Sequence, residues 1–235
     1  MDEATARIIL YAITAVGVFV WLWGLQFLIA AAREGRGDQV EAGERFEVGE
    51  APAPDRIRGS AEVAGTPADL SLRAAAALAD PGPNQLGLVK VLERTDDRLV
   101  FEGLGPNVQT QASGTSSWTG LRRGEMQFKG VGPDRTRIDF MVDRSGGRWL
   151  LGLGGLFQAM GLIALVGGFW AMQSYVIPAA NLGVRGQVFQ MMQVVHFLWP
   201  PFLFGQLYRV RRRALRTGLE VLVHNLPYRL NGSCG

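Results

Sequence analysis

The chain has 235 residues, of which 48% are hydrophobic and 19% are charged, and its formal net charge at pH 7 is +3. This balance excludes a disordered tail protein, a collagen and a strongly basic nucleic-acid packager. The single cysteine, Cys234, excludes an intramolecular disulfide and a cysteine-rich zinc ribbon. Only two histidines are present, so we expect no multi-histidine metal site and we predict no cofactor.

The first long apolar stretch, residues 8–32, lies near the N-terminus and contains no charged residue. It exceeds the roughly 20 residues that a helix needs to cross a hydrocarbon core about 30 Å thick. A cleaved signal peptide is the alternative, because residues 30–32 are three alanines and resemble a cleavage site. However, Asp2 and Glu3 make the N-terminus acidic, and the stretch is longer than the apolar region of about 7–15 residues in a signal peptide. We therefore predict an uncleaved transmembrane helix.

Two further apolar stretches lie in the second half of the chain. Residues 149–177 are also uncharged and end at Pro178, which predicts a second transmembrane helix. Residues 188–208 are uncharged but include polar side chains and the pair Pro200–Pro201, which predicts a kink. This third stretch either crosses the membrane or enters it and returns. We favour a crossing, because neighbouring helices satisfy the carbonyl groups that a kink frees.

Arginines at the ends of these stretches predict which side of the membrane each segment faces. They are densest directly after the third stretch, and such clusters mark the cytoplasmic side. We name this cluster the arginine run and expect it to attract anionic lipid headgroups. The arginine run consists of Arg209, Arg211, Arg212, Arg213 and Arg216. Arg33, Arg36, Arg144 and Arg148 flank the region between the first two stretches and place it on the same side, whereas a re-entrant third stretch would place it outside.

The predicted organisation has eight segments. In chain order they are an extracytoplasmic N-terminus (1–7), a transmembrane helix (8–32), a linker (33–55), a cytoplasmic α+β domain (56–147), a second transmembrane helix (149–177), an outer loop (178–187), a third transmembrane or re-entrant segment (188–208) and a basic cytoplasmic tail (209–235). Within the tail, residues 219–226 are amphipathic and either lie along the membrane or a partner, or extend the tail without a contact.

The predicted α+β domain begins with a strand and a helix. Residues 57–63 alternate between apolar and polar, as in a half-buried strand. Thr66 suits a helix N-cap, Pro67 suits the first helical position and Asp69 suits the acid of a capping box. One face of this helix carries Leu70, Ala74, Ala77 and Leu78.

Two β-hairpins follow this helix. Their predicted strands are residues 86–94 and 98–103, then 118–129 and 136–143, and the long polar loop 104–117 separates the two hairpins. We therefore predict an antiparallel sheet of about five strands with one helix, apolar on one face and solvated on the other. Five aspartates at turns and on the polar face are interpreted as solvated surface rather than a carboxylate site: Asp96, Asp97, Asp134, Asp139 and Asp143.

This order of elements resembles a small START-like (helix-grip) domain. The resemblance covers about residues 57–147 and rests on IRGSAEVAGTPADLSLRAAAAL followed by the two hairpins. Members of the family typically have more strands and a C-terminal amphipathic helix against the sheet, whereas here the helix in that position is apolar all round. The resemblance implies a carrier or sensor of a lipid or another hydrophobic ligand. A plain α+β domain that packs its helix on the apolar face is the alternative.

Two features of the apolar stretches are candidate sites. His196 is a candidate ligand of a haem or chlorin or a proton-relay residue, but the other histidine, His224, lies in the tail. We therefore favour a histidine that either is hydrogen-bonded to a neighbouring helix or supports the kink beside Pro200–Pro201. Small residues along the second stretch predict close helix packing, either on another subunit or on the chain's own helices. These residues are Gly155, Ala159, Ala164, Gly167, Gly168 and Ala171.

No constellation of residues indicates catalysis or nucleic-acid binding. The serines of the long loop have no histidine nearby in sequence and no G-x-S-x-G motif, and the arginine run lacks interleaved aromatic residues. Arginine far outnumbers lysine, and alanine and glycine are abundant, which indicates a bacterial source. We predict a non-catalytic inner-membrane protein, an accessory or scaffolding subunit that contacts lipids and other membrane-protein helices. The alternative is a membrane-tethered START-like carrier.

Overall fold

The computed structural model describes residues 2–37, 55–79, 89–103, 120–179 and 182–228. The chain divides into two compact units. We name residues 1–33 with 149–208 the helical unit, and residues 34–148 with 209–235 the sheet unit. Most of the predicted linker and the long loop 104–117 lie outside the described residues.

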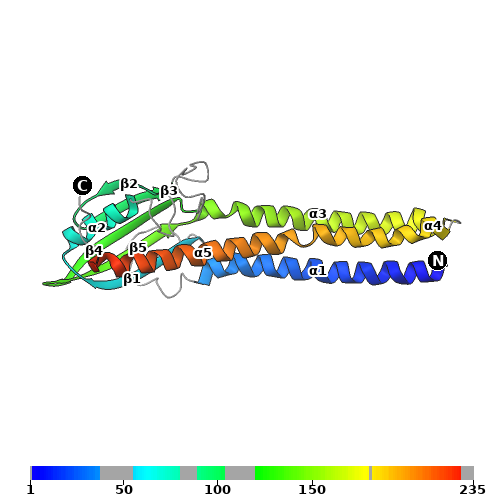
Figure 1. The fold of residues 1–235 in the computed structure, drawn as a ribbon, viewed down its shortest axis with the longest axis horizontal. Helices are drawn as coiled ribbons and strands as arrows, with labels where there is room; N and C mark the ends of the chain where they lie inside the picture. Colours follow the sequence, from blue (N-terminus) through cyan, green and yellow to red (C-terminus); the bar gives the residue numbers. More distant parts are fainter. Residues whose placement is uncertain (1, 38–54, 80–88, 104–119, 180–181, 229–235) are drawn as a thin grey trace. The chain divides into compact units, whose positions relative to one another are not determined.

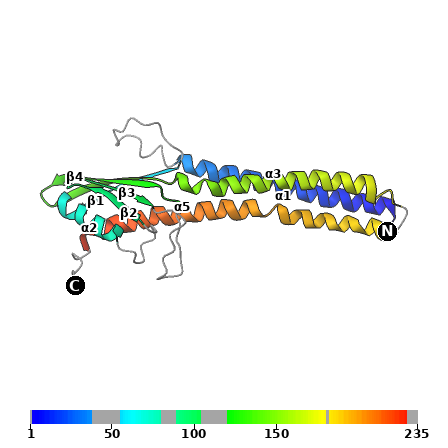
Figure 2. The same ribbon diagram turned by 90° about the horizontal axis from the view of Figure 1, so that it is seen from above.

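The helical unit contains α1 (Glu3–Gly37), α3 (Trp149–Ala171), the π-helix η2 (Met172–Val176), α4 (Leu182–Arg185), the 3₁₀-helix η3 (Gly186–Phe197) and the first part of α5 (Pro200–Asn225). Figures 1 and 2 show α1, α3 and the η3–α5 segment side by side. Two helical segments are long and apolar enough to cross a membrane, Glu3–Glu34 and Ser145–Val176. The first two apolar stretches are therefore helices, as the sequence predicts.

The third apolar stretch is interrupted, as the two prolines predict. η3 ends at Phe197, and α5 begins at Pro200, where a missing N–H group removes no helical hydrogen bond. The boundary between the two units falls between Tyr208 and Arg209, where the predicted tail begins, but α5 does not end there and continues to Asn225. The reason is that the arginine run continues the helix without a glycine or proline to end it.

The sheet unit contains a five-stranded antiparallel sheet in the order β1-β5-β4-β3-β2, which confirms the predicted sheet. Its elements are β1 (Arg56–Ala64), α2 (Pro67–Ala79), β2 (Val89–Arg94), β3 (Arg98–Gly103), β4 (Arg123–Gly132) and β5 (Arg135–Asp143), with η1 (Ser145–Gly147) and η4 (Leu226–Tyr228). The second hairpin turns more tightly than predicted, because β4 continues to Gly132. Thr66 caps α2, since its Oγ1 accepts a hydrogen bond from the Asp69 backbone at 3.4 Å.

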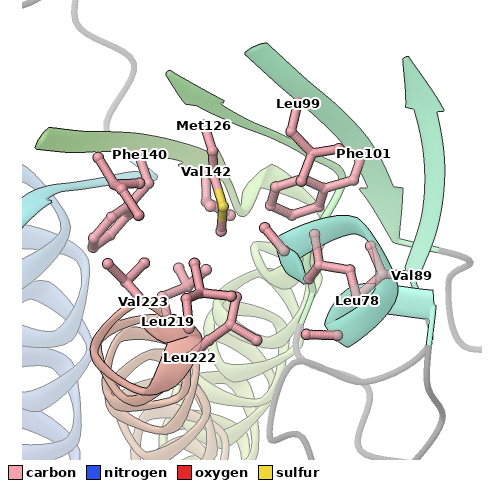
Figure 3. Packing of buried hydrophobic residues seen from close by; sticks show 14 of the residues in the cluster. Leu78, Val89, Leu99, Phe101, Met126, Phe140, Val142, Leu219, Leu222 and Val223 are labelled. Atoms are coloured by element: carbon pink, nitrogen blue, oxygen red, sulfur yellow. The ribbon is translucent and has the colours of Figure 1, made fainter. Parts of the chain in front are cut away.

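Two helices, rather than the predicted one, cover the apolar face of the sheet. Figure 3 shows Leu219, Leu222 and Val223 of α5 pointing toward the sheet, beside Leu78 of α2. Leu219 and Val223 are completely buried. Residues 219–226 therefore form part of a folded core, and the expectation that they lie along the membrane or a partner, or extend the tail without a contact, is wrong. Their apolar face is satisfied within the chain because the sheet leaves room beside the short α2.

The opposite face of the sheet carries charged side chains in register, as the alternation predicts. Asp139 lies on this face but is not solvated as we predicted, because it is only 2% exposed. It accepts a hydrogen bond from Arg137 Nε at 3.0 Å and lies 3.5 Å from Lys129 Nζ. Its neighbours on β5 and on the adjacent strand β4 thus cover it and pair its charge.

Candidate functional site

The helical unit exposes an extensive apolar surface. Each of its two long helical segments contains an apolar window of 18 residues. In Glu3–Glu34, 17% of this window is buried, and in Ser145–Val176, 28% is buried. Core helices of soluble proteins are mostly buried, and these two are not. Large exposed hydrophobic residues occur along α1, α3 and η3, and include Ile8, Phe19, Trp23, Ile163, Val166, Trp170, Phe189 and Met192. Such a surface marks contact with a membrane or with other apolar proteins.

Three glycines of α3 allow close packing inside the helical unit. Gly154, Gly161 and Gly168 are seven residues apart, so they lie on one side of the helix. A Cβ would lie 2.7 Å from Leu28 at Gly154, 2.6 Å from Leu198 at Gly161 and 2.7 Å from Met191 at Gly168. Of these three, Gly168 alone is among the packing residues that we predicted.

The other predicted packing residues lie differently. A Cβ at Gly155 or Gly167 would meet no other atom within 4 Å, and Ala159 is exposed. Ala164 and Ala171 are partly buried. The sequence left open whether α3 packs on its own chain or on another subunit. The structure assigns one side of α3 to its own chain and leaves a second, small-residue side exposed.

A buried glutamine joins α1 to α3. Trp21 Nε1 donates a hydrogen bond to the Gln158 backbone oxygen at 2.8 Å, and Gln158 Nε2 donates to the Trp21 backbone oxygen. The Gln158 side chain is 4% exposed, and its Oε1 has no hydrogen-bond partner among the described residues. Sequence reasoning missed this pair because a single glutamine in an apolar stretch does not reveal its partner.

His196 is exposed at the end of η3. Its side chain forms no hydrogen bond with a neighbouring helix within the described part of the chain, and support of the kink, the other alternative that we favoured, stays a prediction. The other histidine, His224, lies near the end of α5 in the sheet unit. Three glutamines of η3 are exposed as well: Gln187, Gln190 and Gln193.

The arginine run lies on α5 at the start of its sheet-unit part. Arg209 forms an ion pair of 3.1 Å with Glu34, and Arg216 one of 2.9 Å with Glu220. Arg212 is 8% exposed. Arg213 is exposed. Several of these guanidinium groups are therefore engaged by the chain itself, a result that the sequence did not predict.

The arginines that flank α3 are also held by the chain. Arg148 donates a hydrogen bond to the carboxylate of Asp55, and the Arg144 backbone N–H donates to the Asp55 backbone oxygen at 3.0 Å. The Arg144 side chain is 1% exposed. Asp55 thus fixes the segment between β5 and α3.

The polar face of the sheet holds one carboxylate with a clear pKa shift. Burial raises the pKa of Glu125, but hydrogen bonds from Arg98 Nε at 2.9 Å and Gln127 Nε2 at 3.2 Å outweigh burial. The charges of Arg98 and Arg123 act in the same direction, and the net pKa lies below its usual value. Glu125 is therefore a paired structural carboxylate, held ionised at neutral pH.

Within the described ranges, no group of three histidine, cysteine, aspartate or glutamate side chains is arranged to hold a metal ion. Comparisons with protein-family models, with curated proteins and with solved structures gave no match.

Proposed function

We propose that this chain is an integral membrane protein that anchors a small α+β domain, and that it serves as an accessory or scaffolding subunit of a larger bacterial membrane complex. The single observation that carries the proposal is the outer surface of the helical unit. α1 and α3 combine long apolar windows with little burial, and Ile163 at the middle of α3 is 72% exposed. A hydrocarbon environment accounts for this surface because it needs no polar side of the helix.

The arginines support a cytoplasmic sheet unit. Arg33 and Arg148 adjoin the two long apolar helices, and Arg209, Arg211 and Arg213 follow the third apolar segment. Positive residues near the ends of membrane helices favour the cytoplasmic side. This orientation requires a third crossing by η3 and the first part of α5, and it places the N-terminus outside.

A role in assembly is supported by surfaces that suit other helices. The exposed side of α3 carries Gly155, Ala159 and Gly167, which would let a neighbouring backbone approach closely. The described residues present charged clusters that pair with one another, as Glu125 with Arg98 and Asp139 with Arg137. Such pairs stabilise a fold and do not form a nucleophile with its base.

Size measurement of the full chain in a mild detergent tests this function. The tagged chain, purified from its host, should migrate on a native gel with other membrane proteins. An unrelated three-helix membrane protein with the same tag is the control for incidental association. A chain that purifies as an isolated monomer would contradict the role in assembly.

A second candidate function is a tethered START-like carrier of a hydrophobic ligand. One observation favours it: the amphipathic end of α5 lies across the apolar face of the sheet, as Leu219 and Val223 show (Figure 3). This is the arrangement that the resemblance implies, although a different segment provides the helix. Lipid analysis of the purified full chain tests it, with Leu219→Phe as a variant that enlarges a buried side chain between helix and sheet. A bound lipid lost from the variant would favour the carrier, and no enrichment of any lipid would reject it.

A further inference from the structure

η3 presents a straight line of hydrogen-bonding side chains. Gln187, Gln190, Gln193 and His196 recur at every third residue, and all four are exposed. We name them the polar line. None of the four side chains forms a hydrogen bond with any other residue that the structure describes.

The 3₁₀ geometry of η3 makes this line straight. A 3₁₀-helix has 3.0 residues per turn and rises about 2 Å per residue, so residues i and i+3 lie directly above one another. The polar line is therefore about 18 Å long. In an α-helix, with about 100° per residue, the same four side chains would spiral around half of the helix.

The other two sides of η3 have different surroundings. Val188 and Met191 are buried against α1 and α3, in a cluster with Leu10 and Leu165. Phe189 and Met192 are exposed and apolar, with 54% and 58% of their surface accessible. η3 thus has a packed side, an apolar exposed side and a polar exposed side, and the last does not suit lipid.

We propose that the polar line is the contact between two copies of this chain in the membrane. The inference rests on the proposed function, because it takes η3 to lie within the hydrocarbon core. There, an exposed amide has no water to replace its hydrogen bonds, and the cost of leaving it unpaired favours association.

A second copy is the occupant that the chemistry of the line favours. Each glutamine amide carries two N–H donors and an acceptor oxygen, and neutral His196 carries one donor and one acceptor. The line is therefore uncharged and complementary to itself, as the interface of a twofold dimer requires. Lipid headgroups reach only its ends, because the line covers more than half of a hydrocarbon core about 30 Å thick.

Disulfide cross-linking of the full chain in its membrane tests the proposal. In a Cys234→Ser background, Gln190→Cys and Gln193→Cys are compared with Phe189→Cys and Met192→Cys, which lie on the apolar exposed side of the same helix. We expect severalfold more linked dimer at 190 and 193 than at 189 and 192. Equal linking at all four positions, no linking at 190 and 193, or linking there to a different polypeptide would overturn the proposal.

A second measurement avoids introduced cysteines. The variant Gln190→Leu with Gln193→Leu remains apolar enough to insert, and we expect its dimer to dissociate about tenfold more readily, a loss of about 1.4 kcal/mol. The matched variant Phe189→Leu with Met192→Leu should dimerise like the unaltered chain, and an undiminished dimer in the glutamine variant would contradict the proposal.

Failure of the proposed function is distinguishable from failure of the dimer contact. If the chain is not an integral membrane protein, an alkaline carbonate wash releases it from membranes. If only the present inference fails, the chain resists the wash but does not pair with itself.

Discussion

The ring of Phe140 on β5 lies directly over Gly59, its opposite neighbour on β1. A Cβ at Gly59 would lie 2.2 Å from Phe140 Cζ, closer than any side chain allows. The same arrangement recurs at Gly124 and Phe101, where the distance would again be 2.2 Å. Aromatic rings thus fill the space above glycines of neighbouring strands and pack the apolar face of the sheet.

Adding a methyl group at Gly59 should weaken the sheet. We expect Gly59→Ala to lower the free energy of opening of β1 and β5 by about 1–3 kcal/mol, the usual cost of overpacking. Hydrogen exchange of the full chain measures this change. The control is Gly130→Ala, where the nearest atom, Pro67 Cγ, would be 3.8 Å from the new Cβ. Equal protection in the two variants would contradict the packing described here.

The core position of the end of α5 gives a second prediction. Leu219→Ala should cost about 2–5 kcal/mol, because it leaves a cavity beneath the sheet. Val221 on the same helix is 52% exposed, and Val221→Ala should change the stability of the sheet unit by about 0.5 kcal/mol or less. Urea unfolding of the full chain, followed by hydrogen exchange in β4 and β5, compares them. A tail that lay on a membrane would give similar, small effects for both variants.

Acid should weaken the sheet unit through Glu125. The pKa of Glu125 in the folded chain lies below the usual value of about 4.5. The ion pairs of Glu125 therefore stabilise the fold fully at any pH above about 4.5. Between that value and the lower folded pKa, the unfolded chain binds more protons, and stability falls as the pH falls. Glu125→Gln should remove this part of the pH dependence, whereas Glu62→Gln, on the same polar face, should retain it. Urea midpoints measured from pH 6 to pH 3 provide the comparison, and identical acid sensitivity with and without Glu125 would refute the assignment.

The two sides of α3 predict opposite results for neighbouring glycines. Gly154→Val should destabilise the helical unit by about 1–3 kcal/mol, because the new side chain meets Leu28 and Phe204. Gly155→Val should change the stability of the single chain by about 0.5 kcal/mol or less, since its position is open. Thermal unfolding in detergent distinguishes them. If Gly155→Val destabilised the helical unit as much as Gly154→Val does, the assignment of the intramolecular contacts to the Gly154 side of α3 would be wrong.

Local patterns predicted most of the individual elements. The alternation around Met126 and Phe128 and the cap at Thr66 depend on neighbours in sequence, so the strands and α2 followed from the chain alone. The partner of an amphipathic segment depends on tertiary contacts instead. For that reason Leu219 and Val223 were recognised as one side of a helix but were assigned to the wrong surface.

The candidate sites were less accessible to sequence reasoning. Gln190, Gln193 and His196 were noted as polar residues in an apolar stretch, whereas Gln187 was assigned to the predicted outer loop. An α-helical period conceals the alignment of the four, which only a 3₁₀-helix produces. Asp139 was expected to be solvated because alternation identifies the polar face of a strand but not how the neighbouring Arg137 and Lys129 cover it. The burial of Arg144 and Arg212 likewise depends on contacts between distant segments.

The most direct test asks whether the helical unit lies in lipid. A fluorophore on Ile163→Cys, in a Cys234→Ser background, is compared with one on Leu72→Cys of the sheet unit, since Ile163 and Leu72 are 72% and 49% exposed. In vesicles whose lipid tails carry a quencher, we predict strong quenching at 163 and little at 72, with the opposite order for aqueous iodide. If iodide quenched the fluorophore at position 163 as strongly as the one at position 72, the conclusion that the helical unit lies in lipid would be contradicted.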